Sequence, residues 1–594
     1  MQKMLMGNEA IAYGAVRAGV GVVSGYPGTP STEVLETAAK LNDGSFYVEW
    51  STNEKAALEV AAGASYAGVR TLVTMKQVGL NVASDPLMSL VYVGTRAGMV
   101  ILVADDPGPM SSQTEQDTRH FGKYANVPVF DPTSVEEAYE MIQDAYRLSE
   151  EWQLPVFFRP TTRICHGCAV VNVQEEKQPR TKGKFTKDSS FVIFPALSRR
   201  RHSEIEAQQY DIAKIFSAYR FNTVSGSGDA AVVASGISYA YAKEAMDSLD
   251  AQAKLVKITT PFPFPTDFIQ TALDGVKRVL VAEELDPVVE EALHIWAHET
   301  GATLEIRGKM TGDLPKVSEF SFEIVQKAIA DFLGLPLAKQ YREVPENLPV
   351  RPPVLCAGCP HRASFYAVKR AMRGEKAVFT GDIGCYTLGN AKPLDMCDTC
   401  LCMGASVTIA QGLKRAEPDT KLFAFIGDST FFHTGIPGVV NAIYNKTNIT
   451  LVVLDNATTA MTGHQPHPGI GRTMMNETAP VIDIPAVLSA LGVGFVEVCN
   501  PFEQNKAIEL VQKAAAYPGV SAIVFRAPCI ALFKKEKTCR VTEDCKKCGI
   551  CLKELGCPAM SRTADGRAMI EPSLCNGCGL CRQICPFEVI CDEI

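Results

Sequence analysis

The chain has 594 residues, of which 46% are hydrophobic and 21% charged, and its formal net charge is −8. This composition is typical of a globular protein, the length predicts about four domains, and the acidic balance disfavours a general nucleic-acid binder. The sequence has no run of eighteen apolar residues and no basic N-terminal segment followed by an apolar run. We therefore expect no membrane span, no secretory signal and a cytoplasmic location.

Residues 1–180 alternate between strand and helix patterns, which predicts an α/β domain with a parallel sheet. Strands are expected at Thr71–Met75 and Met99–Ala104, and a helix at Lys55–Ala67. The stretch GVGVVSGYPGTPSTEVLETAA predicts a strand, a Gly/Pro loop and a helix with Ser31 or Thr32 at its N-cap.

Residues 181–222 are mixed and basic, which indicates a connecting segment with a short helix, and their SRRRH run favours a solvated or docking face. Residues 223–345 predict a second α/β domain, with AAVVASGIS and RVLVAEEL as strands and SYAYAKEAMDSL as a helix. We expect no catalytic residue there. Glu283 and Glu284 are expected to be structural, with acids at the rim of a site as the alternative.

Residues 350–533 predict a third α/β domain that contains a βαβ unit, with strands at Leu422–Ile426 and Ile449–Leu454. Asp428 follows the first strand and Asn456 the second. Parallel sheets bind ligands outside the carboxyl ends of their strands, and Mg²⁺ completes such an oxygen-ligand set with water and substrate phosphates. The unit therefore predicts a metal–diphosphate anchor, with ordinary turn residues as the alternative.

Residues 538–594 carry the most specific pattern, two Cys-x2-Cys-x2-Cys runs that each end in a later Cys-Pro. In a reducing compartment this spacing indicates metal rather than disulfides, whereas the lone pair Cys165 and Cys168 is assigned no metal. The runs predict a ferredoxin domain with two [4Fe-4S] clusters, in which the fourth cysteine of each run binds the other cluster. The first run has five residues before its fourth cysteine instead of three, which should bulge that loop. The predicted ligand sets are Cys545, Cys548, Cys551 and Cys585, and Cys575, Cys578, Cys581 and Cys557.

The βαβ unit, with FIGDST and LDNATTAMTGHQ, resembles the thiamine diphosphate (TPP) motif of the 2-oxoacid:ferredoxin oxidoreductases, although Ser429 and Asp455 replace a Gly and an Asn of that motif. The resemblance implies TPP with Mg²⁺ bound by Asp428, Asn456 and the carbonyl of Thr458. We expect His361, His433, His464 and His467 to line the pocket. His464 and His467 are the best placed because they lie in the diphosphate loop, and His464 is the catalytic candidate. The remaining cofactor-binding residues would be Gly427, Ser429, Thr462, Gly463 and Gln465.

The loop YPGTPSTE resembles the YPITPS loop of the family's pyrimidine-binding domain, which implies that Thr29 meets the substrate carboxylate. Arg119 is the best match to an arginine that binds the same carboxylate, and a solvated surface arginine is the alternative. Glu54 matches the acid that hydrogen-bonds the aminopyrimidine of TPP, with Glu59 as a second candidate. Without the resemblance, a helix-start acid favoured by the helix dipole would be the commoner explanation of Glu54, and the resemblance favours the catalytic role instead.

CAGCPH, GDIGCYT and RAPCIAL are similar to the segments that hold a TPP-proximal cluster in the family. The resemblance implies a possible third [4Fe-4S] cluster, and buried free thiols are the alternative. Its ligands would be Cys356, Cys359, Cys385 and Cys529, with Cys397, Cys400 and Cys402 competing for the fourth position.

The order of these domains resembles the alpha subunits of the indolepyruvate ferredoxin oxidoreductase family. It implies an α/β multidomain fold: pyrimidine and diphosphate TPP domains, a transketolase C-terminal-like domain at 223–345 and the ferredoxin domain. The implied reaction converts an arylpyruvate and CoA to aryl-acetyl-CoA and CO₂, and electrons pass through the clusters to ferredoxin. The implied partner is a beta subunit of gamma-domain type in an α₂β₂ assembly. The alternatives are another 2-oxoacid, or an electron-transfer subunit with a vestigial TPP fold.

Overall fold

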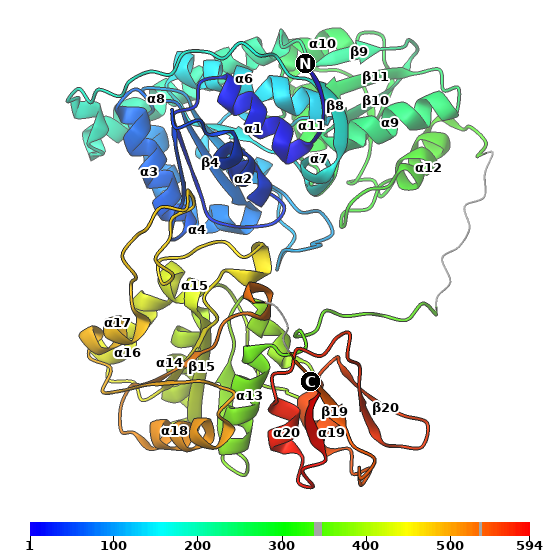
Figure 1. Ribbon diagram of the computed structural model, residues 1–594. Coiled ribbons are helices and arrows are strands. Elements are labelled where there is room, and N and C mark those ends of the chain that lie inside the picture. The colour runs from blue at the N-terminus through cyan, green and yellow to red at the C-terminus, as the bar shows by residue number, and fades with distance from the viewer. Residues whose placement is uncertain (338–346, 534–536, 594) are drawn as a thin grey trace. The chain divides into compact units, whose positions relative to one another are not determined.

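The computed structural model describes residues 1–337, 347–533 and 537–593. It divides into two compact units, Met1–Pro345 and Glu346–Ile594 (Figure 1). Within the described residues, no helix combines the length and the apolar content needed to cross a bilayer.

The first unit begins with a six-stranded parallel sheet in the order β3-β2-β4-β5-β7-β6. The predicted strands and helix are β4, β5 and α3, and Ser31 occupies the N-cap of α2. An antiparallel pair, β1 (Gln2–Met6) and β8 (Cys168–Asn172), lies outside the sheet. The strands of the sheet are β2 Val22–Gly25, β3 Tyr47–Trp50, β4 Thr71–Lys76, β5 Met99–Ala104, β6 Val129–Phe130 and β7 Val156–Phe158. The helices are α1 Gly7–Arg17, α2 Thr32–Leu41, α3 Glu54–Tyr66, α4 Gln77–Val93, α5 Arg119–Ala125, α6 Val135–Trp152 and α7 Thr162–His166.

The connecting segment contains a long helix, α8 (Pro195–Ser217), so the prediction of a short helix is wrong. Its buried residues, Ile205, Ile212 and Phe216, recur at helical spacing and form one apolar stripe. That stripe stabilises 23 residues as a helix, although the SRRRH run at its start is polar.

The second sheet of this unit has the order β13-β12-β10-β11-β9, in which only β9 is antiparallel to its neighbour. The predicted strands are β10 and β12, and the predicted helix is α9. The strands are β9 Thr223–Ser225, β10 Ala230–Ser235, β11 Lys254–Ile258, β12 Arg278–Ala282 and β13 Glu305–Arg307. The helices are α9 Ile237–Ser248, α10 Thr266–Ala272, α11 Val288–Thr300 and α12 Phe322–Leu333.

The second unit is built on a five-stranded parallel sheet in the order β14-β15-β16-β18-β17. Successive residues of β15 point into two separate cores, one on each face of the sheet. A π-helical turn, Phe431–Gly435, interrupts the helix that follows β15. The strands are β14 Ala377–Thr380, β15 Lys421–Gly427, β16 Thr450–Asp455, β17 Phe495–Cys499 and β18 Ser521–Arg526. The helices are α13 Pro360–Ala371, α14 Ala405–Ala416, α15 Asp428–Thr430, α16 Ile436–Tyr444, α17 Ile484–Leu491 and α18 Gln504–Ala516.

The C-terminal module of the second unit packs against α13 through Leu555 and Leu580, which contact Ala363 and Tyr366 (Figure 1). It consists of two small antiparallel pairs, β19 with β22 and β20 with β21, and two short helices. The elements are β19 Thr538–Val541, α19 Ile550–Leu555, β20 Met560–Arg562, β21 Ala568–Ile570, α20 Leu580–Ile584 and β22 Ile590–Glu593.

Candidate functional site

Asp428 and Asn456 meet where the adjacent parallel strands β15 and β16 end. Asp428 is only 3% exposed. Its Oδ1 accepts a hydrogen bond from the backbone N–H of Ser429 (2.8 Å). Its Oδ2 accepts one from the backbone N–H of Asn456 (3.0 Å). The Nε2 atom of His467 lies 3.1 Å from the same Oδ2. Burial favours the neutral acid, but His467 and the Ser429 amide outweigh it and hold the pKa of Asp428 below its ordinary value.

The surroundings of Asn456 supply further oxygen atoms. Its Nδ2 lies 3.2 Å from Nε2 of His361, and its Oδ1 accepts a hydrogen bond from the Thr458 amide at 3.3 Å. Burial lowers the pKa of His361 to about 4, although Asp428 favours the charged ring. The buried Thr458 Oγ1 has no hydrogen-bond partner among the described residues, and such a group requires an explanation. A buried carboxylate, an amide and an unpaired hydroxyl suit a hard cation with a diphosphate.

The two departures from the TPP motif have local partners. Ser429 Oγ accepts a hydrogen bond from Thr459 Oγ1 at 3.0 Å. Asp455 accepts one from Nε of Arg526 at 2.7 Å, so an ion pair holds the acid that replaces the motif's Asn. Gly427 is required for space, because a Cβ there would lie 2.4 Å from the Tyr386 ring.

The loop after β16 is closed by Gln465. Its Oε1 accepts a hydrogen bond from Thr462 Oγ1 (2.6 Å), and its Nε2 donates one to the Thr462 carbonyl (2.8 Å). Gly463 and His464 have positive φ angles of 122° and 67° at the turn. His464 is exposed in this unit, whereas His467 is buried against Asp428. Of the histidines that the sequence placed in this loop, His467 is therefore the one at the anchor.

Glu54 is the first residue of α3, and the Asn53 side chain caps this helix by accepting a hydrogen bond from the Ala56 amide at 2.8 Å. Glu54 is 5% exposed. A Cβ on Gly79 would lie 2.6 Å from its Oε1, so the start of α4 needs a glycine beside this carboxylate. Glu59, the second candidate, is exposed and forms an ion pair with Lys55. The structure therefore favours Glu54 of the two acids.

Lys76 lies beside the Thr29 loop, and the sequence analysis missed it. It ends β4, and a Cβ on Gly28 would approach its Cγ to 3.2 Å. Its Nζ is 3.5 Å from the carbonyl oxygen of Ser111, whose hydroxyl donates to the Thr29 carbonyl at 3.1 Å. Burial lowers the pKa of Lys76, while Asp106 and Glu54 favour its charged form. A lysine at the carboxyl end of a buried strand was the signal available in the sequence.

Arg119 does not face a substrate site. Its side chain is 0% exposed and forms ion pairs with Asp117 (2.5 Å) and Glu283 (2.7 Å). It also donates to the backbone carbonyls of Glu284 and Asp286, both at 2.9 Å. Because these groups occupy its donors, Arg119 cannot bind a substrate carboxylate in this conformation. The predicted role is corrected to a structural one, and Glu283 and Glu284 are buried structural acids rather than acids at a rim.

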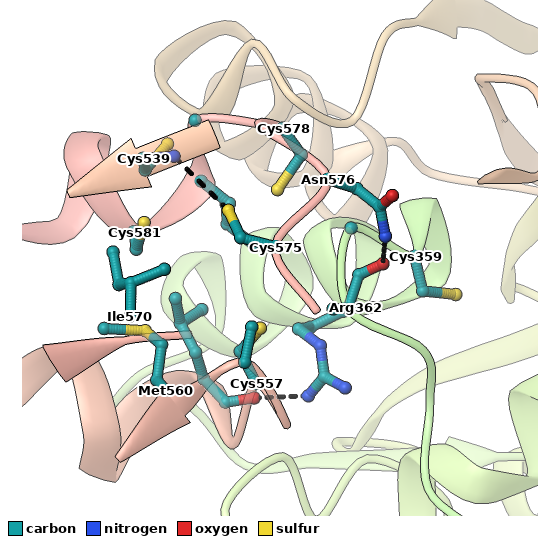
Figure 2. Close-up of a pocket in the computed structure, with 16 residues that line it drawn as sticks. Cys359, Arg362, Cys539, Cys557, Met560, Ile570, Cys575, Asn576, Cys578 and Cys581 are labelled. Atoms are coloured by element: carbon teal, nitrogen blue, oxygen red, sulfur yellow. Dashed lines mark hydrogen bonds between the residues drawn. The ribbon is translucent and has the colours of Figure 1, made fainter. Parts of the chain in front are cut away.

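The cysteines of the C-terminal module line two cavities. The outer cavity is lined by Cys545, Cys548, Cys551 and Cys585 and, among the described residues, by none of residues 350–533, the predicted diphosphate domain. The inner cavity is lined by Cys557, Cys575, Cys578 and Cys581 together with Ala357, Gly358, Cys359 and Arg362 of the diphosphate domain (Figure 2).

Each cavity thus gathers three cysteines of one run and the fourth of the other, which is the predicted grouping. The described cysteines are all free thiols. No three of the described His, Cys, Asp or Glu side chains are arranged to hold a metal ion on their own. Four thiols around one cavity fit a cluster that brings its own iron and sulfide.

Two details of the inner cavity differ from the sequence prediction. Cys539 of β19 contributes a fifth thiol, and its amide donates to Cys575 Sγ at 3.4 Å. The additional residues of the first run form no bulge, because they extend α19 to Leu555 before Gly556 ends it at φ 60°.

The four cysteines proposed for a third cluster are linked in pairs, because burial and Cys356 raise the pKa of Cys359, and Cys356 also acts on Cys385 together with Cys529. Burial, together with nearby Cys529 and Cys356, raises the pKa of Cys385 to about 11. The sulfur of Cys359 points away from Cys575 and Cys578 in Figure 2. The third cluster stays a prediction, and the cysteines that compete for its fourth position form a separate group near Asp382. That group is Cys397, Cys400 and Cys402.

Three protein-family models match the chain. Residues 13–213 match the thiamine-diphosphate-binding part of pyruvate flavodoxin/ferredoxin oxidoreductases. Residues 382–525 match the C-terminal TPP-binding domain of thiamine pyrophosphate enzymes, and residues 568–591 match a 4Fe-4S binding domain.

Curated relatives are similar over nearly the full length. The indolepyruvate oxidoreductase subunit IorA of Methanothermobacter thermautotrophicus is 42% identical over 99% of this chain and 97% of its own. The subunit of the same name from Thermococcus kodakarensis is 43% identical over 98% of this chain and 96% of its own. Among solved structures, a 2-oxoglutarate:ferredoxin oxidoreductase from Magnetococcus marinus is 18% identical, with a TM-score of 0.46 over 56% of this chain and 65% of that one.

Proposed function

Because the chain belongs to the family of the indolepyruvate oxidoreductase IorA subunits, we propose that it oxidatively decarboxylates arylpyruvates, with indolepyruvate as the first candidate. The products would be aryl-acetyl-CoA, CO₂ and reduced ferredoxin. The coarser activity, oxidoreduction of a 2-oxoacid with ferredoxin, follows from the TPP-binding and 4Fe-4S matches and from the names of the relatives.

One observation carries the proposal. Two consecutive residues at the start of α13 face different sites: His361 contacts Asn456 of the anchor, and Arg362 lines the inner cavity. A decarboxylation site and a cluster cavity joined at one helix start suit a reaction that releases CO₂ and transfers electrons. A non-oxidative TPP lyase would need only the first.

The proposed roles come from the resemblance, and the contacts within each unit support them. TPP, when bound, supplies the electron sink for decarboxylation. Asp428, Asn456 and the Thr458 carbonyl would hold Mg²⁺, and Gln465 would keep the diphosphate loop closed. Glu54 of the first unit would hydrogen-bond the aminopyrimidine.

We further propose Lys76, in place of Arg119, as the cation that meets the substrate carboxylate beside Thr29. Lys76→Met should then raise KM for the 2-oxoacid at least tenfold, because a charge-assisted hydrogen bond contributes about 1.5–3 kcal/mol. The KM for CoA should not change. An unchanged KM for the 2-oxoacid would exclude this role.

The function is tested by initial rates of ferredoxin reduction with CoA and each of four acids: indolepyruvate, phenylpyruvate, pyruvate and 2-oxoglutarate. The assay contains the proposed partner, a beta subunit of gamma-domain type in an α₂β₂ assembly. Asp428→Ala is the control, since it should lose TPP and activity while the visible absorbance of the clusters persists. A preference for pyruvate or 2-oxoglutarate would assign another 2-oxoacid. No TPP in the wild-type protein would indicate an electron-transfer subunit.

A further inference from the structure

Arg362 joins the diphosphate domain to the ferredoxin module. Its Nη1 donates to the backbone carbonyls of Leu555 (2.6 Å) and Gly556 (2.9 Å) at the end of α19. Its Nη2 donates to the Leu355 carbonyl at 2.6 Å, just before α13. These partners are neutral carbonyls, and no ion pair of Arg362 occurs among the described residues.

The guanidinium is buried with one donor unpaired. Arg362 is 4% exposed, and its Nε has no hydrogen-bond partner within the described part of the chain. Figure 2 shows Arg362 among the cysteines of the inner cavity, with a dashed bond to a carbonyl beside Cys557. A buried charge costs several kcal/mol unless something compensates it. Three carbonyls compensate it in part, and an anionic group in the cavity would complete the compensation.

The irregular spacing of the first cysteine run builds this contact. Cys551 and Cys557 enclose five residues, whereas Cys581 and Cys585 enclose three. The longer segment ends with the two carbonyls that Arg362 binds. Gly556 also approaches Pro393, whose Cδ would lie 2.4 Å from a Cβ at this position. The additional length therefore brings the ferredoxin module onto α13 at the inner cavity.

We propose that Arg362 raises the reduction potential of the cluster in the inner cavity and thereby makes it the first cluster of the ferredoxin module to accept electrons from the TPP site. A nearby cation stabilises the reduced, more negative cluster, and potentials respond to local charge, to hydrogen bonds on sulfur and to solvent exposure. As far as the described residues show, the outer cavity has no buried arginine in its lining, and of the two cavities the inner one borders the diphosphate domain. The direction of transfer rests on the proposed function, whereas the effect on potential does not.

The test is an anaerobic redox titration of the full-length chain with its clusters, followed by electron paramagnetic resonance. Arg362→Gln should shift the midpoint potential of the inner cluster to a more negative value and leave those of the other clusters unchanged. Cys548→Ser, which removes an outer ligand, identifies the shifted signal as the inner cluster. Arg373→Gln is the matched control, because it removes the same charge from an exposed ion pair with Glu554 at the same contact.

Arg362→Lys separates charge from docking. It keeps the positive charge but loses the planar fork, so the inner midpoint should stay near its wild-type value. If the Arg362→Gln protein holds no inner cluster, the inner midpoint of the Arg362→Lys protein decides the test. The proposal is overturned if the inner midpoint of Arg362→Lys falls well below the wild-type value, if Arg362→Gln leaves the inner midpoint unchanged, or if it shifts the inner and outer midpoints equally. The titration uses dithionite as the reductant and needs no 2-oxoacid. Such a result would therefore not bear on the proposed substrate.

Discussion

Each unit buries an arginine where two of its domains meet, and the two arginines differ in their partners. Arg119 in the first unit binds two carboxylates, Asp117 and Glu283. Arg362 in the second unit binds carbonyls alone, next to a cavity lined by thiols. The first charge is neutralised by the protein, and the second is not.

The difference separates a structural ion pair from a charge available to a cofactor. Burial favours the neutral acid of Asp117, but Arg119 and Arg159 outweigh it and hold its pKa well below the ordinary value. Arg159 continues the network through Asp105 at 2.7 Å. No comparable acid approaches Arg362 among the described residues. Both arginines are buried, and the charge of their neighbours distinguishes the two sites.

The largest effect is expected from Arg119→Gln, because it leaves Asp117 and Glu283 buried without their cation. The loss of stability should be about 3–5 kcal/mol, measured as an earlier unfolding transition of the first unit in denaturant. The matched control is Arg163→Gln, which breaks an exposed pair with Glu319 in the same unit and should cost less than about 1 kcal/mol. Equal losses from the two variants would contradict the comparison.

A smaller effect is expected from Gly556→Ala, which disturbs the docking of Arg362. An alanine at φ 60° costs about 1–2 kcal/mol, and its Cβ would also meet Pro393 at 2.4 Å. Gly566→Ala is the control, because φ there is 91° and the nearest atom to a Cβ is 3.8 Å away, on Lys547. Thermal loss of cluster absorbance should therefore come earlier in Gly556→Ala than in Gly566→Ala. The reverse order would show that the contact with Pro393 is unimportant.

What the sequence could predict depended on how far apart the partners lie. The cysteine sets and the Asp428–Asn456 anchor follow from short spacings or from one βαβ unit, so local patterns were sufficient. Arg119 and Glu283 are 164 residues apart, and Arg362 and Leu555 are 193 apart. The sequence alone does not identify such distant pairs. The family resemblance assigned Arg119 to the substrate carboxylate, but its ion pairs with Asp117 and Glu283 exclude that role. Lys76 was missed because its neighbours come from two other loops.

The smallest effect on folding stability, taken per pH unit, is expected from Glu284→Gln. Glu284 lies next to Arg119, which donates to its backbone carbonyl. Burial raises the pKa of Glu284 to about 7, against 4.5 for the free acid, although the Phe320 amide donates to its Oε1 at 2.8 Å. Its Oε2 has no partner among the described residues, as suits a protonated acid. Between pH 4.5 and 7 the unfolded chain binds fewer protons here than the folded one, so this group's contribution to stability is lost as pH rises through that window.

Glutamine does not titrate and keeps the contact with Phe320. The stability of Glu284→Gln relative to wild type should therefore grow by at most about 1.4 kcal/mol per pH unit up to pH 7, and then level off. Denaturant unfolding at several pH values measures this slope. A relative stability that falls with pH would mean that Glu284 is ionised and shares Arg119's charge. The expected slope would instead show that Asp117 and Glu283 already neutralise Arg119. Among the described residues, no carboxylate neutralises Arg362 in this way.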